Sequence, residues 1–315
     1  MNFSVVIPLY NKALHIERAI NSVLNQTVQD FEIIVVNDGS TDHGEEIVKR
    51  ITDPRIRLIN QENRGVSAAR NRGAEEAKYD LIAYLDADDE WLPEYLRNIQ
   101  MLINNFPDCG AYATAVKAIR PNRSVFYPNI SSLPTEPWIG IVPNIFQLIS
   151  DAPSAIHSSA VVIPRKILSS VGGFPLDVTL MEDITCWIKI AVRYPIAYNT
   201  KRLAIYHQES ENRSSNQILL NDAPFSNEIF QAIDSGQLTQ YLAIEAKEFA
   251  NKYRLIAAIN NILKGNSNQA HILLTSCKST KKYRKRWTVW NFMSFLPSRW
   301  IITFLKMKTS LFAGK

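Results

Sequence analysis

The 315-residue sequence has only three cysteines, Cys109, Cys186 and Cys277. They are too few, too scattered and odd in number for a disulfide framework, which favours a reducing compartment. Residues 1–8 show no basic segment followed by a long apolar run, so no signal peptide is expected. No apolar run approaches the roughly 20 residues of a transmembrane helix. These absences predict a cytoplasmic protein.

Two common nucleotide-binding motifs are also missing. The sequence contains neither G-x-G-x-x-G after its first apolar run nor G-x-x-x-x-G-K-[ST] anywhere. An EF-hand loop beginning at Asp86 is excluded, because Trp91 would take the glycine position and Arg97 the closing glutamate. If the protein binds a nucleotide, a metal ion and a few basic side chains must therefore neutralise the phosphates.

Charge is distributed unevenly along the chain. The formal net charge is +5, yet residues 278–315 contain ten Lys and Arg and no acidic residue. The first 277 residues then hold 25 basic and 30 acidic residues. This pattern argues against nucleic acid as a partner of the main domain. It predicts that the C-terminal segment attracts an anionic partner locally.

The hydrophobic pattern predicts an α/β protein. At 46% apolar residues, the chain is long enough for one large domain and an appendage. Short apolar runs alternate with segments of helical spacing, which predicts a mostly parallel, doubly wound sheet with ligands at the carboxyl ends of its strands. The expected strands are residues 3–8, 31–36, 55–59, 81–85, 110–116 and 158–163, and a helix is expected at about 66–78.

The fourth apolar run ends in three carboxylates, Asp86, Asp88 and Asp89. If the extended conformation persists past Leu85, the side chains of Asp86 and Asp88 point the same way and offer hard oxygen ligands to a divalent cation. A diphosphate would be its anionic co-ligand. The alternative is a solvated acidic turn that caps a helix opening near Pro93.

Four segments, in this order and spacing, resemble glycosyltransferase family 2 with the GT-A fold: residues 5–12 (VVIPLYNK), 36–42 (VNDGSTD), 64–73 (RGVSAARNRG) and 86–89 (DADD). The resemblance implies a Rossmann-like sheet flanked by helices, of the non-processive bacterial polysaccharide or O-antigen type. It predicts a catalytic domain at residues 1–215, a helical extension at 216–280 and a basic, aromatic, membrane-associating tail at 281–315.

The resemblance also implies a nucleotide-sugar site, with UDP as the expected nucleotide. Asp38 would bind the nucleobase, Lys12 and Arg70 the base or phosphates, and Asp86 would lie near the ribose and sugar. Asp88 would bind Mn²⁺ or Mg²⁺, which stabilises the departing diphosphate. Asp38 could instead form an Asx-turn, and Lys12 could be a surface charge. The full expected set for the nucleotide sugar is Pro8, Tyr10, Lys12, Asp38, Arg70, Asp86 and Arg213.

A second acidic motif follows Gly172-Gly173-Phe174-Pro175. The resemblance makes Asp183 the catalytic base that takes a proton from the acceptor hydroxyl. Alternatively, Asp183 and Glu182 cap a helix. His207 stands where the family has a histidine near the metal, although a structural role is also open. Arg213 could close over phosphate or pair with a nearby glutamate.

The tail interleaves basic residues with three of the six tryptophans, which suits an anionic membrane surface. Nucleic acid would also attract this composition, and a packed helical cap is the other alternative. Tyr283 and Leu296 replace the glutamine of the Gln-x-x-Arg-Trp motif of processive synthases, which favours transfer of a single sugar. We therefore expect a metal-dependent inverting glycosyltransferase that acts on a polyprenyl-diphosphate-linked glycan at the inner face of the cytoplasmic membrane. The rivals are a sugar-phosphate nucleotidyltransferase, which should carry a glycine-rich loop, and a non-catalytic sugar-binding or membrane-scaffold protein.

Overall fold

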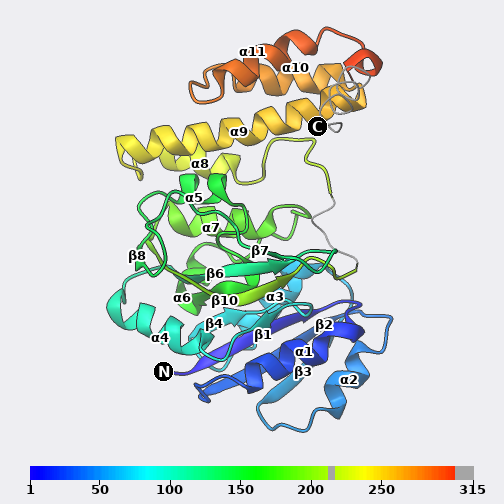
Figure 1. Cartoon of the computed structure of the whole chain (residues 1–315), viewed down its shortest axis with the longest axis vertical. Coiled ribbons are helices and arrows are strands. Elements are labelled where there is room, and N and C mark those ends of the chain that lie inside the picture. Colours follow the sequence, from blue (N-terminus) through cyan, green and yellow to red (C-terminus); the bar gives the residue numbers. More distant parts are fainter. Residues whose placement is uncertain (212–216, 302–315) are drawn as a thin grey trace. The chain divides into compact units, whose positions relative to one another are not determined.

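The computed structural model describes residues 1–211 and 217–301 (Figure 1). The chain forms two compact units, Met1–Arg213 and Ser214–Lys315. The first unit holds the sheet, and the second is helical among its described residues. The predicted separate tail beginning at residue 281 stays a prediction.

The first unit is built on one ten-stranded sheet with the main order β3-β2-β1-β4-β9-β6-β10-β5. Its parallel half consists of β1 (Phe3–Leu9), β2 (Phe31–Asp38), β3 (Ile56–Gln61) and β4 (Leu81–Tyr84). The antiparallel β9 (Val161–Pro164) joins this half to the parallel pair β6 (Ala111–Ile119) and β10 (Ile196–His207). Three short antiparallel strands complete the sheet, β5 (Glu90–Trp91), β7 (Val125–Phe126) and β8 (Ile139–Ile141). The predicted mostly parallel sheet is confirmed.

Helices cover this sheet, as Figure 1 shows. They are α1 (Ala13–Leu24), α2 (Gly44–Arg50), α3 (Val66–Glu75), α4 (Tyr95–Asn105), α5 (Ile145–Asp151), α6 (Arg165–Ser170) and α7 (Glu182–Ala191). In α1 the buried residues recur at helical spacing and join the core of β1 and β2, whose residues are all buried. The predicted helix at 66–78 ends three residues early, at Glu75.

Helix α3 approaches β1 unusually closely. A Cβ atom at Gly73 would lie 2.3 Å from Val6 Cγ1, so only glycine permits this contact. The close approach fixes the position of α3 along the sheet. As a result, the preceding turn of the helix, with Arg70 and Asn71, is held at a defined place beside the carboxyl end of β4.

The second unit contains α8 (Ser226–Asp234), α9 (Gln240–Lys264), α10 (Ser267–Ser276) and α11 (Arg284–Met293). Thr239 caps α9 at its start, and Gly265 ends it in the left-handed conformation. Helices α9 and α10 share their own buried cluster, which includes Leu255, Ile262 and Cys277. Among the described residues, no helix combines the length and apolar character needed to cross a membrane.

Candidate active site

The segment after β4 is a tight turn rather than an extension of the strand. The strand ends at Tyr84, and the Asp89 amide donates to the Asp86 carbonyl at 3.0 Å. The alternation expected of an extended chain therefore does not apply, and that expectation is wrong. Asp86 and Asp88 instead take different partners, as Asp86 Oδ1 lies 2.8 Å from Arg70 Nη2 and Asp88 Oδ2 lies 2.7 Å from Lys12 Nζ.

Asp88 sits in a polar cradle. Its carboxylate accepts from the Lys12 ammonium and from the Ser210 hydroxyl at 2.5 Å, and Lys12 also donates to the Glu211 carbonyl. Burial acts to raise the pKa of Asp88, but the Lys12 and Ser210 hydrogen bonds hold that pKa below its usual value. The carboxylate is thus ionised, and a metal ion at Asp88 would have to share or replace the Lys12 contact.

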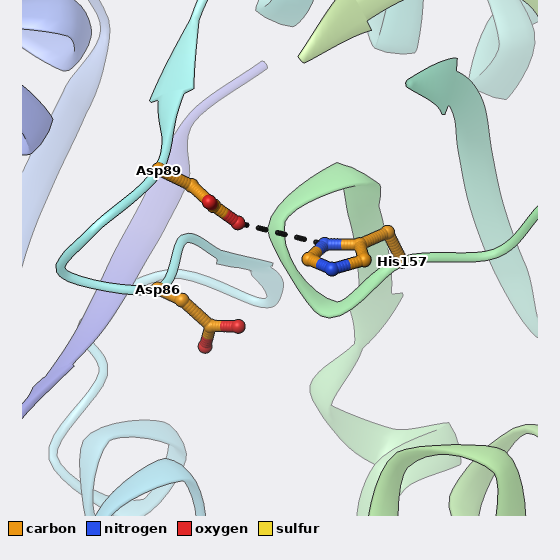
Figure 2. Close-up of side chains that lie close together, drawn as sticks. All are labelled: Asp86, Asp89 and His157. Atoms are coloured by element: carbon orange, nitrogen blue, oxygen red, sulfur yellow. Dashed lines mark ion pairs between the residues drawn. The ribbon is translucent and has the colours of Figure 1, made fainter. Parts of the chain in front are cut away.

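One group of side chains has the geometry to hold a metal ion. Asp86, Asp89 and His157 each offer a ligand atom, and the three atoms lie within 4.8 Å of one another (Figure 2). Asp89 Oδ2 is 3.6 Å from His157 Nδ1. Burial, with the charges of Asp88 and Asp86, raises the pKa of Asp89 well above its usual value. Carboxylate oxygens and an imidazole nitrogen are suitable ligands for a divalent cation, which would bind here as Asp89 loses its proton.

Sequence reasoning did not identify Asp89 or His157 as site residues. Asp89 stood inside the quoted acidic motif and could have been found there. His157 had no comparable signal, since it precedes the 3-10 turn Ser158–Ala160, where a strand was expected, and reaches the acidic turn only through the fold. Ser159 in that turn bonds Asp89 through its hydroxyl group and so holds the two segments together.

His207 lies beside this group with its ring engaged elsewhere. Its Nδ1 is 2.6 Å from Glu209 Oε1 and its Nε2 is 3.1 Å from Glu90 Oε1, while its amide donates to Asp89 Oδ1. Burial acts to lower the pKa of His207, but the two carboxylates raise it. A protonated ring has no lone pair for a metal, so this arrangement fits the structural alternative. Its role as a metal ligand stays a prediction.

Arg70 joins the acidic turn to the start of α7. Its side chain is 4% exposed, and its guanidinium bonds Asp86 through Nη2 at 2.8 Å and Glu182 Oε1 through Nη1 at 3.2 Å. It also lies over the Phe174 ring at 5.2 Å. Burial acts to lower the pKa of Arg70, but the Asp86 and Glu182 carboxylates outweigh this effect and raise the pKa above its usual value. The guanidinium is therefore permanently charged. The predicted contact of Arg70 with base or phosphate stays a prediction.

Asp183 follows Glu182 in the first turn of α7 and is partly buried. Its Oδ1 accepts from the Ile184 amide at 2.7 Å. Burial and the negative charge of Glu182 raise the pKa of Asp183 to about 6, against the opposing effect of Arg70. A carboxylate with such a pKa is a competent general base near neutral pH.

Three of the remaining predicted nucleotide residues lie at the carboxyl ends of the neighbouring parallel strands β1 and β2. Asp38, at the end of β2, is 2% exposed and accepts from Gln61 Nε2 and from the backbone amides of residues 64 and 65 at 2.7–2.9 Å. It therefore orders the loop before α3 rather than a local Asx-turn. Pro8 is buried in β1, whereas Tyr10 is 47% exposed. Arg213 lies outside the described residues.

Comparison with known proteins points to one family. A family model described as Glycosyl transferase family 2 matches residues 4–167. An uncharacterized glycosyltransferase of Rickettsia felis is 30% identical over 224 residues, 67% of this chain and 35% of that protein. The uncharacterized glycosyltransferase YibD of Escherichia coli is 47% identical over 92 residues, 29% of this chain and 27% of YibD. The chain thus spans about a third or less of the length of these relatives.

A solved structure resembles most of the chain. Residues 1–349 of Staphylococcus aureus TarS, crystallised with UDP-GlcNAc, superimpose with a TM-score of 0.69 at 16% identity, covering 95% of this chain and 90% of that one. At this identity the likeness concerns the fold alone. The predicted GT-A fold with C-terminal helices is confirmed.

Proposed function

Because this chain belongs to glycosyltransferase family 2, we propose that it transfers a single sugar from a nucleotide-sugar donor to a hydroxyl group of a glycan acceptor. One observation supports this most directly. Arg70 connects the acidic turn after β4 to the acid pair that begins α7, so groups suited to the donor and to proton abstraction share one ionic network. The expected reaction needs both.

The proposed donor is a UDP-sugar. UDP-GlcNAc is bound by the TarS structure that shares this fold, and the lack of a glycine-rich phosphate loop in this chain leaves phosphate binding to cations. Lys12 is one of the cations at the acidic turn, where its Nζ lies 2.7 Å from Asp88 Oδ2. Asp86, Asp89 and His157 are grouped closely enough to hold Mn²⁺ or Mg²⁺. The predicted ligand Asp88 would join them by exchanging its Lys12 contact for the metal ion.

In the proposed reaction, Asp183 accepts the proton of the acceptor hydroxyl as that oxygen attacks the anomeric carbon. The new carbon–oxygen bond forms opposite the breaking bond to the diphosphate, so the configuration inverts. A positioned base accelerates such a step about 10²- to 10⁴-fold. The metal ion, when bound, stabilises the negative charge of the departing nucleoside diphosphate. Glu182 raises the pKa of Asp183 and Arg70 opposes this effect, so the two residues together tune the basicity of Asp183.

We place the acceptor at a membrane. A polyprenyl-diphosphate-linked glycan in cell-surface polysaccharide synthesis fits the basic C-terminal segment and a peripheral position on the inner face of the cytoplasmic membrane. A nucleotidyltransferase is disfavoured, since residues 9–12 lack its glycine-rich loop. A non-catalytic sugar-binding or scaffold protein remains the alternative, and turnover separates it from the proposal.

The test is nucleoside diphosphate release from a panel of nucleotide sugars with Mn²⁺ or Mg²⁺. The intact chain is compared with Asp183→Asn and Asp88→Ala, and with Asp177→Asn as a control at an exposed carboxylate on the loop before α7. We expect release with one donor, lost in the first two variants and kept in the control. Release unaffected by Asp183→Asn would reject Asp183 as the base. Donor binding without release, in the presence of candidate acceptors, would favour the non-catalytic alternative.

A further inference from the structure

Helix α11 packs its two tryptophans against α9 and α10 of the same unit. Trp287 and Trp290 are partly buried against the cluster of α9 and α10, and Trp287 Nε1 donates to the Leu274 carbonyl at 2.8 Å. The sequence had suggested these tryptophans as membrane contacts, but the structure uses them to attach α11 to its own unit. A membrane contact by α11 must therefore come from its other face.

That other face is apolar and exposed. Val289 is 53% exposed and Phe292 67%. Phe295, just after the helix, is 71% exposed, although one side of its ring lies 4.9 Å from the His271 ring of α10. Lys285 precedes Val289 and Phe292 by four and seven residues, so the three side chains share one face of the helix. Arg286 lies at the edge of this face, and both cations are exposed. We call Lys285, Arg286, Val289, Phe292 and Phe295 the α11 outer face.

The charge around this face indicates its partner. No acidic residue occurs from position 278 to 315. The carboxylates of α9 that contact the start of this segment are engaged, Glu245 by the Lys282 ammonium and Glu248 by the Thr280 hydroxyl. Cations beside protruding phenylalanines match a surface that is anionic outside and apolar beneath, which is the character of an anionic lipid bilayer. A nucleic acid would satisfy the cations, but it would leave the aliphatic Val289 without a suitable contact.

We propose that the α11 outer face docks the protein on an anionic lipid surface, with Phe292 and Phe295 inserted at the acyl boundary and Lys285 and Arg286 at the headgroups. The docking goes beyond the proposed sugar transfer, since vesicle binding requires no donor, metal or turnover. The two proposals can therefore fail separately.

The test is co-sedimentation of the full chain with phosphatidylglycerol/phosphatidylcholine vesicles and with phosphatidylcholine vesicles alone. We expect binding to the anionic vesicles only, weakened at least tenfold in Phe292→Ser/Phe295→Ser and weakened by added salt in the intact chain. Lys285→Gln/Arg286→Gln should also bind less. The control is Ile244→Ser, which removes a side chain that is 56% exposed on α9 of the same unit.

Three outcomes would overturn the proposal. One is absence of binding to anionic vesicles by the intact chain. Another is equal binding by the Phe292→Ser/Phe295→Ser variant, which would assign the contact to another part of the chain. The third is an equal loss in Ile244→Ser, which would indicate a general effect of exposed apolar area. Far-ultraviolet circular dichroism and thermal midpoints verify that each variant is folded.

Discussion

Arg70 and Glu182 are separated by 112 residues in the sequence, yet their side chains form an ion pair with an Nη1–Oε1 distance of 3.2 Å. Both are buried, and the second guanidinium nitrogen of Arg70 binds Asp86. Removing one partner of a buried pair leaves the other charge uncompensated, which destabilises more than the pair stabilises. The charges of Arg70 and Glu182 also act on the neighbouring Asp183.

Glu182→Gln should move the pH dependence of sugar transfer. Glu182 contributes to the raised pKa of Asp183, so its neutralisation should lower that pKa and shift the acid limb of kcat to lower pH. Glutamine keeps an oxygen for Arg70 and so preserves the geometry. The charged or titratable groups that act on Asp183 are Glu182, Arg70 and His157, and the Ile184 amide also lowers its pKa. A kcat–pH profile measures the shift. The control variant Asp177→Asn should leave the acid limb of kcat at its original pH. An unshifted limb would contradict this role of Glu182.

Asp183 should also make stability depend on pH. Its pKa in the folded protein is about 6, above the ordinary 3.8, so between these values the folded state binds a proton that the unfolded state releases. Stability due to this group is present below about pH 4 and is lost as pH rises through 6. Asp183→Asn should therefore raise the unfolding free energy at pH 8 by about 1–3 kcal/mol. Thermal midpoints measured at pH 4.5 and 8 should show the gain shrinking at the lower pH. Equal gains at both would contradict the prediction.

Lys12 should compete with a metal ion for Asp88, because its ammonium lies 2.7 Å from that carboxylate. In Lys12→Met the competitor is gone, so Mn²⁺ alone should bind several-fold more tightly. UDP should bind more weakly, since a cation near its phosphates is lost. Mn²⁺ binding is followed by electron paramagnetic resonance and UDP binding by calorimetry, with Lys12→Arg as the charge-preserving control. Weaker binding of both ligands would show that Lys12 supports the metal site instead.

The framework of the fold could be predicted because it is local in the sequence. The runs that became β1, β2, β3 and β4 are short, apolar and separated by helical segments, and such patterns identify parallel strands without knowledge of partners. The edge strand β3 has no fully buried residue, so its signal is the weakest of the four. The acidic turn after β4 and the acid pair of α7 were found from motifs. Their residues could therefore be named before any distance was known.

The partners within the site could not be predicted in the same way. Whether Arg70 faces a phosphate or Glu182 depends on how α3 packs against β1 and α7. A local sequence pattern does not specify that packing. His157, just before β9, comes close to Asp89 because β9 pairs antiparallel with β4, and this pairing joins segments far apart in the sequence. Likewise, composition treats Trp287 and Phe292 alike, and only packing against α10 decides which of them is exposed.

The two adjacent glycines before α7 both have a left-handed backbone, but only the second lies close to another side chain. Gly172 has φ +77° and nothing within 4 Å of an added Cβ, whereas Gly173 has φ +70° and its Cβ would lie 2.7 Å from Asn71 Oδ1. Asn71 uses both ends of its amide on Phe174, donating to its carbonyl at 2.8 Å and accepting from its amide at 2.9 Å. Phe174 in turn lies against Arg70.

Gly172→Ala should therefore lower stability by about 1–2 kcal/mol through left-handed strain alone and leave sugar transfer nearly intact. Gly173→Ala adds the loss of the Asn71 bonds, about 1–3 kcal/mol more, and should also reduce kcat, because Phe174 and Arg70 shift beside Asp183. Thermal midpoints and transfer rates compare the two variants. If the Asn71 bonds are the cause, Asn71→Ala should add little further loss in the Gly173→Ala background. Fully additive losses would instead mean that the added methyl group disturbs another part of the loop.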